Sequence, residues 1–207
     1  GRQGRHWSSP PGNLYASLIL RPSIAVDQAP QFSFVAAVAM ADTLASLLPA
    51  PTQVCHKWPN DVLVAGRKIA GILLESSVCD GGVLEWLVVG VGVNVDSHPV
   101  NGDYEPTSLR AQGLEIEPEA VLTALCDRIL GWRERWLGEG FAPVRAAWQD
   151  RALGINDLLL VEVSGQIMEG NYLGIDENGA LVLDVPGSGR RLITVGEVGN
   201  MHGLWGR

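Results

Sequence analysis

A glycine- and arginine-rich segment, Gly1–Trp7 (GRQGRHW), could bind an anionic group. Glycine lets the backbone approach an anion closely, and the guanidinium groups of Arg2 and Arg5 offer paired donors to carboxylate or phosphate. Trp7 could stack on a purine base. The same composition is also typical of a solvated terminus, so the segment alone does not decide between binding and solvation.

A second segment, Lys57–Asp61 (KWPND), is followed seven residues later by Lys68. Asp61 can accept hydrogen bonds or bind a metal, Asn60 can donate and accept, and Lys68 is a compact cation. The 15 basic residues include only two lysines, Lys57 and Lys68, which favours ammonium over guanidinium chemistry here. The alternative is a plain Trp-Pro-Asn-Asp turn beside a lysine on a solvated hairpin.

A third segment, Gly90–Asn94 (GVGVN), is similar to a shortened dinucleotide-binding fingerprint. The third glycine is missing and no helix pattern follows directly, so a Rossmann-type site is not favoured. Glycines in a buried strand more often mark a close approach of the backbone to another element or to a ligand.

Other reactive residue types show no arrangement typical of catalysis or metal binding. The sequence contains no G-x-S-x-G and no G-x-x-x-x-G-K-[ST] pattern. The three cysteines are widely spaced, which argues against a disulfide framework or a cysteine-based zinc site. The histidines lack metal-like spacing, and we interpret them as unrelated surface residues. They are His6, His56, His98 and His202.

Hydrophobic periodicity predicts the elements that position these segments. Strands are expected at 14–20, 54–58, 61–64, 68–75 and 84–95. Helices are expected from Pro30 to before Pro49, from Pro118 to about Trp136, and over 142–148. The valine-rich strand at 84–95 is expected to be buried on both faces.

The pattern of the sequence changes after Gly154, where no further helical periodicity is found. Short β-rich stretches are separated by turn pairs such as Ser164–Gly165 and Asn178–Gly179, a pattern typical of a small β-barrel. The sequence therefore predicts an α+β fold, with a mixed β-sheet and flanking helices in residues 1–154 and a small β-barrel in residues 155–207.

Composition narrows the class of protein further. The chain has 207 residues, 46% of them hydrophobic and 18% charged, as in ordinary globular proteins. A net charge of −8 and a pI near 4.9 argue against general nucleic-acid or membrane-surface binding. No apolar run is expected to reach the roughly 18 residues of a membrane-spanning helix, and no leader is visible. A cytoplasmic protein is the expectation.

Taken together, these segments resemble a bacterial biotin protein ligase. The resemblance rests on G-R-x-G-R-x-W and S-P-x-G-N-L-Y at 1–7 and 9–15, and on K-W-P-N-D…K-x-A-G-I-L-x-E at 57–61 and 68–75. G-x-G-x-N at 90–94 and Thr107–Leu109 continue the pattern in order. The resemblance covers nearly the whole chain and implies a class II synthetase-like catalytic domain followed by an SH3-like barrel.

The resemblance also implies an activity. Such ligases join biotin and ATP, with Mg²⁺, into biotinyl-5′-adenylate and pyrophosphate. They then transfer biotin to one lysine of the biotin carboxyl carrier protein of a carboxylase. A homodimer is possible, and neither a membrane nor a nucleic acid is expected as partner of this part. The alternatives are a lipoate protein ligase and a non-catalytic biotin- or adenylate-binding module.

Residue roles follow by position from the same resemblance. Lys68 would bridge the biotin carboxylate and the α-phosphate, Arg2 would cover the adenylate, and Asp61 would position the carrier lysine. The implied catalytic residues are Arg2, Lys68 and Asp61. The implied biotin-binding residues are Gly1, Arg2, Lys68, Gly71, Gly90 and Gly92. The implied ATP-binding residues are Arg2, Trp7, Asn60, Lys68 and Asn94.

The sequence departs from the family pattern at its beginning. Gln3 stands where many members carry another arginine. The family's first strand and helix, with a Ser/Thr-rich turn and a glutamine that hold the biotin ring, would precede Gly1. We therefore expect that an N-terminal stretch is missing from this sequence.

Overall fold

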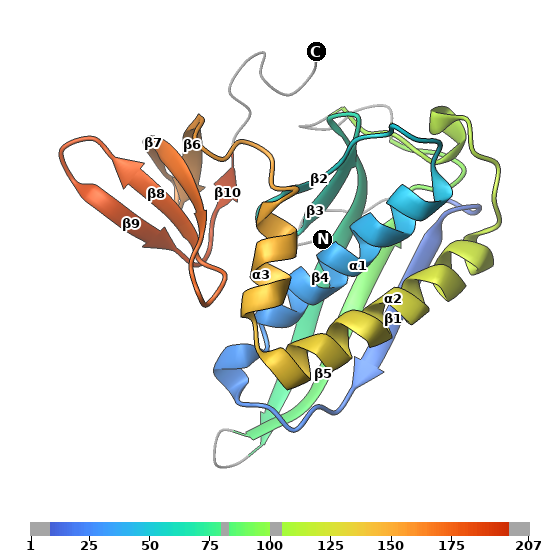
Figure 1. The fold of residues 1–207 in the computed structure, drawn as a ribbon, viewed down its shortest axis with the longest axis horizontal. Coiled ribbons are helices and arrows are strands. Elements are labelled where there is room, and N and C mark those ends of the chain that lie inside the picture. The colour runs from blue at the N-terminus through green and yellow to red at the C-terminus, as the bar shows by residue number, and fades with distance from the viewer. Residues whose placement is uncertain (1–8, 80–82, 100–104, 199–207) are drawn as a thin grey trace.

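The computed structural model describes residues 9–79, 83–99 and 105–198 (Figure 1). The strands of a first sheet are β1 (Leu14–Leu20), β2 (Val54–Lys57), β3 (Asp61–Val64), β4 (Arg67–Cys79) and β5 (Val83–Val93). The helices are α1 (Gln31–Leu47), α2 (Pro118–Glu139) and α3 (Ala142–Gln149), and two short 3₁₀ turns are η2 (Val26–Gln28) and η3 (Arg110–Gln112). The strands of a second sheet are β6 (Leu158–Val163), β7 (Gln166–Ile175), β8 (Leu181–Val185), β9 (Gly189–Ile193) and β10 (Glu197–Val198).

The first sheet has the strand order β1-β5-β4-β3-β2, and every neighbouring pair is antiparallel. Strands β2 to β5 follow one another through short connections, which favours antiparallel pairing. Within the described residues, parallel pairing is limited to two single bridges, His56–Ala152 and Lys68–Pro106. The sheet expected to be mixed is thus antiparallel with two parallel bridges added, and the α+β architecture is confirmed.

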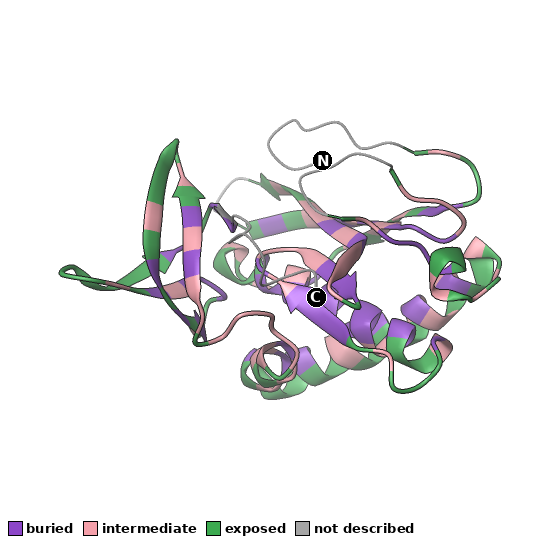
Figure 2. Cartoon of the chain, turned by 90° about the horizontal axis from the view of Figure 1, so that it is seen from above, coloured by how far each residue is buried: buried purple, intermediate pink, exposed green. Residues whose placement is uncertain are grey.

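Helices α1 and α2 cover one face of this sheet (Figures 1 and 2). Nearly every residue of α1 from Gln31 to Leu44 is buried, because the helix lies between the sheet and α2. On β5, Val89, Val91 and Val93 are buried in this core, whereas Gly90 and Gly92 on the other face are partly exposed. The prediction that this strand is buried on both faces was wrong, since its apolar run combines core valines with small outward-facing glycines.

One helical segment, Val26–Leu47, is long and apolar enough to cross a membrane by length and composition. This corrects the expectation that no apolar run approaches that length. In the fold, 67% of its 18-residue window is buried inside the protein. The segment therefore forms the core helix of this fold, and its apolar composition is accounted for by packing against the sheet and α2.

The second sheet has the order β10-β6-β7-β8-β9, again with antiparallel neighbours. Strands β6 to β9 form the short β-rich stretches expected after Gly154, and β10 adds a short strand that was not predicted. The sheet contacts α3 through Ile175, whose N–H donates to Gln149 Oε1 at 2.9 Å and whose carbonyl accepts from Arg145 Nε at 2.7 Å. The division into two domains remains a prediction.

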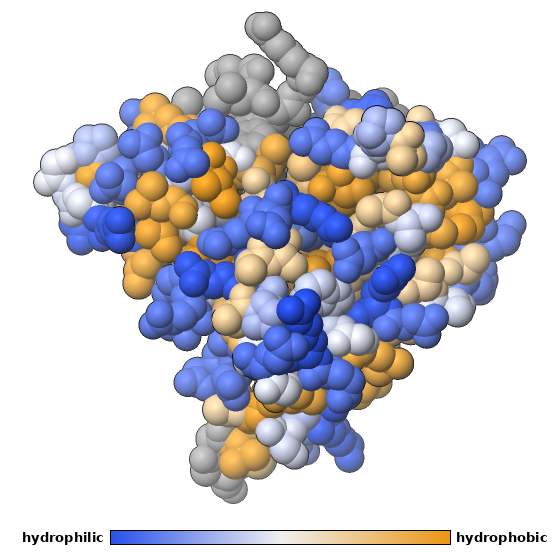
Figure 3. All heavy atoms as spheres, viewed as in Figure 1, coloured by the Kyte–Doolittle hydropathy of each residue, from blue (hydrophilic) through white to orange (hydrophobic). Residues whose placement is uncertain are grey.

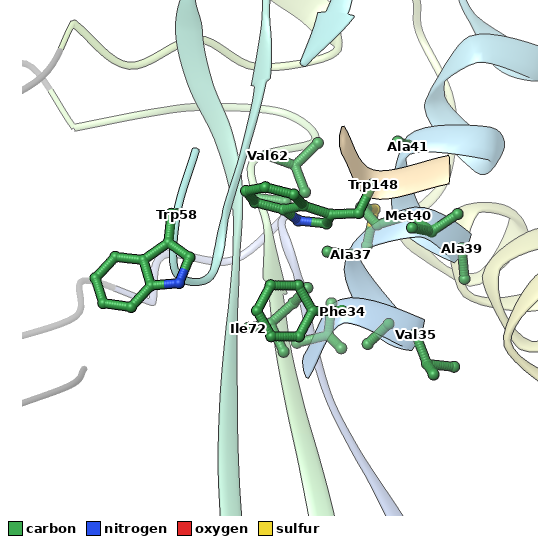
Figure 4. Packing of buried hydrophobic residues seen from close by; sticks show 14 of the residues in the cluster. Phe34, Val35, Ala37, Ala39, Met40, Ala41, Trp58, Val62, Ile72 and Trp148 are labelled. Carbon is green, nitrogen blue, oxygen red and sulfur yellow. The ribbon is translucent and has the colours of Figure 1, made fainter. Parts of the chain in front are cut away.

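An aromatic cluster joins α1, α3 and the edge of the first sheet (Figure 4). Phe34 contacts Trp148 edge-to-face at 5.4 Å between ring centroids, and His56 stacks on Trp148 at 5.5 Å. His56 is fully buried, so its interpretation as a surface residue was wrong. Burial, together with the nearby charge of Arg151, lowers the pKa of His56 to about 3. The cluster therefore holds a neutral imidazole.

Candidate functional site

A row of paired residues crosses all five strands on the sheet face opposite the helices. Tyr15 pairs with Gly92, Gly92 with Gly71, Gly71 with Asp61, and Asp61 with Lys57. Directly paired residues of antiparallel strands place their side chains on the same face. The middle of the row therefore consists of bare backbone at two glycines, with Tyr15 on one side and Asp61 on the other.

The neighbouring row extends this bare area. Ser17 pairs with Gly90, and Gly90 pairs with Leu73. A Cβ added at Gly90 would lie 3.3 Å from the carbonyl oxygen of Leu73, closer than ordinary van der Waals contact. Because strands lie about 4.8 Å apart, Tyr15 and Asp61 are separated by roughly 14 Å along the row. The arrangement leaves room for a small molecule laid on backbone between flanking side chains.

A β-bulge places Lys68 on this face. Val62 pairs with Ala70 and Leu63 pairs with Lys68, so Ile69 is an extra residue in β4. Ile69 and Ala70 are both buried in the core. Regular alternation would put Lys68 and Gly71, three residues apart, on opposite faces. The bulge brings them to the same face instead.

Lys68 and Asp61 form an ion pair on the open face. The distance from Lys68 Nζ to Asp61 Oδ1 is 2.6 Å, and the two side chains are 27% and 13% exposed. The backbone of Lys68 is also fixed, because its N–H donates to the Glu105 carbonyl at 3.1 Å and its carbonyl accepts from Thr107 N–H at 2.8 Å. Lys68 is thus a held, half-buried cation and not a lysine on a solvated hairpin.

Asn60 fixes the turn that leads into Asp61. Its Nδ2 donates to the carbonyl of Ile72 at 2.6 Å, and the N–H of Ile72 donates to the Asn60 carbonyl at 3.0 Å. This reciprocal pair ties the start of β3 to the middle of β4. The side-chain amide of Asn60 is therefore engaged in positioning Asp61 within the fold.

Asn94 joins the end of β5 to the segment at residues 107–109. The side chain is buried, and its Nδ2 donates to the Thr107 carbonyl at 2.9 Å. The Asn94 carbonyl accepts from Leu109 N–H at 3.0 Å, and its own N–H donates to the carbonyl of Ile69 at 2.9 Å. The end of β5, the bulge in β4 and the segment at residues 107–109 are far apart in the sequence, and these bonds bring them together.

The structure brings together most of the residues predicted for the site. Asp61, Lys68, Gly71, Gly90 and Gly92 share the open face. Asn60 and Asn94 adjoin it, each held by a hydrogen bond from its side-chain amide to a backbone carbonyl. The predicted residues that lie outside the described part of the chain are Gly1, Arg2 and Trp7.

Sequence reasoning gave no role to Asn13, which the structure shows to be buried directly before β1, where its side chain hydrogen-bonds to the segment that follows β5. The signal in the sequence was the position of this asparagine, directly before an apolar strand. Asparagine is seldom buried, so a buried one is expected to have specific hydrogen-bond partners. Within the described residues, no three His, Cys, Asp or Glu side chains gather as a metal centre would require.

The helices form the side of the molecule that faces away from this open surface. Its surface is a mixture of hydrophilic and apolar side chains (Figure 3). The helices separate that side from the motif residues, which lie on the opposite face of the sheet.

Residues 6–150 match the family model described as the biotin/lipoate A/B protein ligase family. The chain belongs to this family. It is 39% identical over 204 residues to a biotin–[acetyl-CoA-carboxylase] ligase of Paracoccus denitrificans, covering 96% of this chain and 84% of the relative. It is also 34% identical over 193 residues to the bifunctional ligase/repressor BirA of Bacillus subtilis, covering 89% of this chain and 58% of that protein.

Two solved structures of similar fold are those of a biotin protein ligase. The Aquifex aeolicus enzyme in complex with biotin and ATP superposes with a TM-score of 0.78 at 24% identity, covering 96% of this chain and 82% of that one. Its apo structure gives 0.77 at 22% identity, with coverage of 90% and 82%. The resemblance to biotin protein ligases inferred from the motifs is confirmed.

Proposed function

We propose that this family member is an ATP-dependent biotin ligase that acts on a biotin carboxyl carrier protein through biotinyl-5′-adenylate. The observation that carries the proposal is the Lys68–Asp61 pair beside the glycine-floored face. The names of the relatives support biotin as the acyl substrate, and the structure of a similar fold with biotin and ATP supports the pair of substrates.

In the first step, a biotin carboxylate oxygen attacks the α-phosphorus of ATP and pyrophosphate leaves. The attack brings two anions together and increases the negative charge on the phosphoryl oxygens. A fixed cation lowers this barrier most where water is partly excluded. Lys68, held by Asp61 and by backbone bonds on both sides, is suited to bridge the carboxylate and the α-phosphate.

In the second step, the amine of the carrier lysine attacks the biotinyl carbonyl carbon and AMP leaves. The incoming ammonium must be oriented and must pass a proton to solvent before the free amine can attack. Asp61 faces the same open surface as Lys68 and is the carboxylate that we assign to orienting this amine.

The two substrates would occupy neighbouring parts of the face. We assign biotin to the bare backbone at Gly71, Gly90 and Gly92, and the nucleotide to the side of Asn60 and Asn94. Gly1, Arg2 and Trp7, outside the described residues, keep their predicted roles in covering biotin and the adenylate. Mg²⁺ would arrive bound to the phosphates of ATP, as part of that substrate.

Pyrophosphate–ATP exchange by the full-length protein tests the proposal, with biotin and lipoate as separate acyl substrates. We expect exchange that depends on biotin. Exchange only with lipoate would overturn the proposal in favour of a lipoate ligase, the other branch named in the family description. Silence with both, combined with calorimetric binding of biotinyl-adenylate, would overturn it in favour of a non-catalytic binding module.

The finer architecture and the setting are further proposals. We propose that residues 155–207 form an SH3-like barrel, supported by the five antiparallel strands of the second sheet. We also propose a homodimer, from the resemblance, and a cytoplasmic location, from the composition of the sequence. Sedimentation equilibrium and fractionation of cells would test them.

A further inference from the structure

The side chain of Asn13 makes four hydrogen bonds to one short segment. Its Oδ1 accepts from the N–H groups of Val95 at 2.9 Å, Asp96 at 2.9 Å and Ser97 at 3.1 Å. Its Nδ2 donates to the carbonyl of Ser97 at 2.9 Å. Asn13 is 9% exposed, so these bonds form with little competition from water.

Three consecutive N–H groups that converge on one point form a concave site for a negative or partly negative oxygen. In this fold the carboxamide oxygen of Asn13 fills that site. The same side chain must also donate to Ser97, which a carboxylate cannot do. The combination of one acceptor and one donor at this reach is specific to asparagine.

The segment held by Asn13 directly continues Asn94. Backbone bonds from Leu109 N–H to the Asn94 carbonyl and from Arg110 N–H to the Val95 carbonyl, each 3.0 Å, attach residues 107–110 to it. The Asn94 side chain adds its bond to Thr107. Fixing residues 95–97 therefore also fixes Asn94 and the segment that contacts Lys68 through Thr107.

The backbone next to Asn13 reinforces this contact. The Gly12 carbonyl accepts from Asp96 N–H at 3.2 Å. Gly12 has a φ of +88°, and a Cβ added there would lie 2.9 Å from Asp96 Cβ. The chain before β1 and the chain after β5 thus approach each other closely only because residue 12 has no side chain.

We infer that Asn13 is a positioning residue for the nucleotide half of the site, acting through Asn94 without touching substrate. The inference rests on the proposed function. The biotin half differs, because Gly71, Gly90 and Gly92 are held by direct pairing within the ladder of β1, β5, β4 and β3. Loss of the Asn13 side chain should therefore affect ATP binding and biotin binding to different extents.

The test is steady-state pyrophosphate–ATP exchange by Asn13→Ala, with KM for ATP and KM for biotin measured separately. We expect KM for ATP to rise about tenfold and KM for biotin to change by less than about twofold. Asn13→Asp keeps the hydrogen-bond acceptor and loses the donor. Its KM for ATP is therefore expected to lie between that of the wild type and that of Asn13→Ala. If Asn13→Ala does not fold, the same two KM values can be measured for Asn13→Asp instead.

Gln31→Leu is the matched control. Gln31 is also buried, and its Oε1 accepts from Trp136 Nε1 at 2.9 Å on the helix side of the sheet. We expect it to lower the melting temperature without changing either KM. Equal rises of both KM values in Asn13→Ala, or a lower melting temperature with neither KM changed, would overturn the inference. Absence of biotin-dependent exchange in the wild type would instead overturn the proposed function.

Discussion

The Lys68–Asp61 pair differs from an ordinary surface ion pair in its surroundings. Exposed pairs contribute little because water and salt screen them. Here the carboxylate is mostly buried and the ammonium is largely covered. The charge of Lys68 is therefore kept at one place on the face before any substrate arrives, which is the condition under which a cation stabilises a transition state without reorganisation.

Replacing Lys68 with alanine should slow biotin-dependent pyrophosphate exchange by about a hundredfold or more, because one preorganised charge is lost at the reacting phosphate. Circular dichroism should stay unchanged, since the ladder around Lys68 uses only its backbone. Arg67→Met removes a cation from the adjacent position of β4 and serves as the control, with exchange near the wild-type rate. A Lys68→Ala protein with unimpaired exchange would end the proposed role.

His56 makes stability depend on pH. Both ring nitrogens are buried and lack hydrogen-bond partners within the described residues. Its pKa is about 3 in the folded protein and 6.5 in the unfolded chain. Between these values the unfolded chain binds more protons, so the stabilisation is complete above pH 6.5 and is lost as the pH falls toward 3.

Urea unfolding at several pH values measures this effect. Between pH 6 and pH 4 the wild type should lose up to about 1.4 kcal/mol per pH unit more than His56→Phe, which keeps a ring stacked on Trp148 but cannot be protonated. Identical pH profiles for the two proteins would show that His56 is not held neutral by the fold.

At the scale of elements, strands β1, β5, β4 and β3 present an open face on which the glycines leave the backbone without side chains. Gly90→Val should fill this face next to Leu73 while suiting a strand backbone. We expect KM for biotin to rise about tenfold or more and KM for ATP to change little.

Gly131→Ala on α2 provides the matched glycine control. A Cβ there meets nothing within 4 Å, so this variant should keep both KM values. It should also gain about 0.5–1 kcal/mol of stability from helix propensity. If Gly90→Val bound biotin as tightly as the wild type, biotin would not lie on this backbone.

The sequence allowed most of these elements to be predicted. The strand Leu14–Leu20 and the helix between Pro30 and Pro49 follow from periodicity and from proline positions, and the structure has both. The KWPND segment and Lys68 were expected together, and the ion pair from Asp61 joins them. Local sequence patterns were sufficient to predict features that depend on a single strand or helix.

Other features depend on contacts that no local pattern contains. The bulge at Ile69 arises from the register with β3, and simple alternation along β4 does not predict it. His56 is buried because α3 and residues 151–153 return to cover the sheet edge. Asn13 acquires its role from residues more than eighty positions away.

At the scale of the whole molecule, the second sheet closes the aromatic cluster of the first. Trp58 Nε1 donates to the Gly179 carbonyl at 3.1 Å in a buried bond. Gly179 has a φ of +86°, and a Cβ added there would lie 2.4 Å from Phe34 Cε2. The β7–β8 turn therefore packs between two aromatic side chains, one on α1 and one in the KWPND segment.

Gly179→Ala should cost several kcal/mol of stability, because the strained backbone and the clash with Phe34 add together. Gly187→Ala has a similar φ of +74° with open space around it, so only about 1 kcal/mol is expected. Both sheets should unfold in one transition, as followed by tryptophan fluorescence and circular dichroism. Equal costs for the two variants, or two separate transitions, would contradict a shared core.

The Trp58–Gly179 bond also has a consequence for the order in which the protein is made. Its two residues are 121 positions apart. At about 5–20 residues per second, Gly179 is added roughly 6–24 s after Trp58 during synthesis. Throughout that interval the indole N–H of Trp58 and the face of Phe34 lack their native partner. The newly made first sheet can reach its final packing only when the β7–β8 turn has emerged. A turn in the last quarter of the chain thus completes packing that begins in the first third.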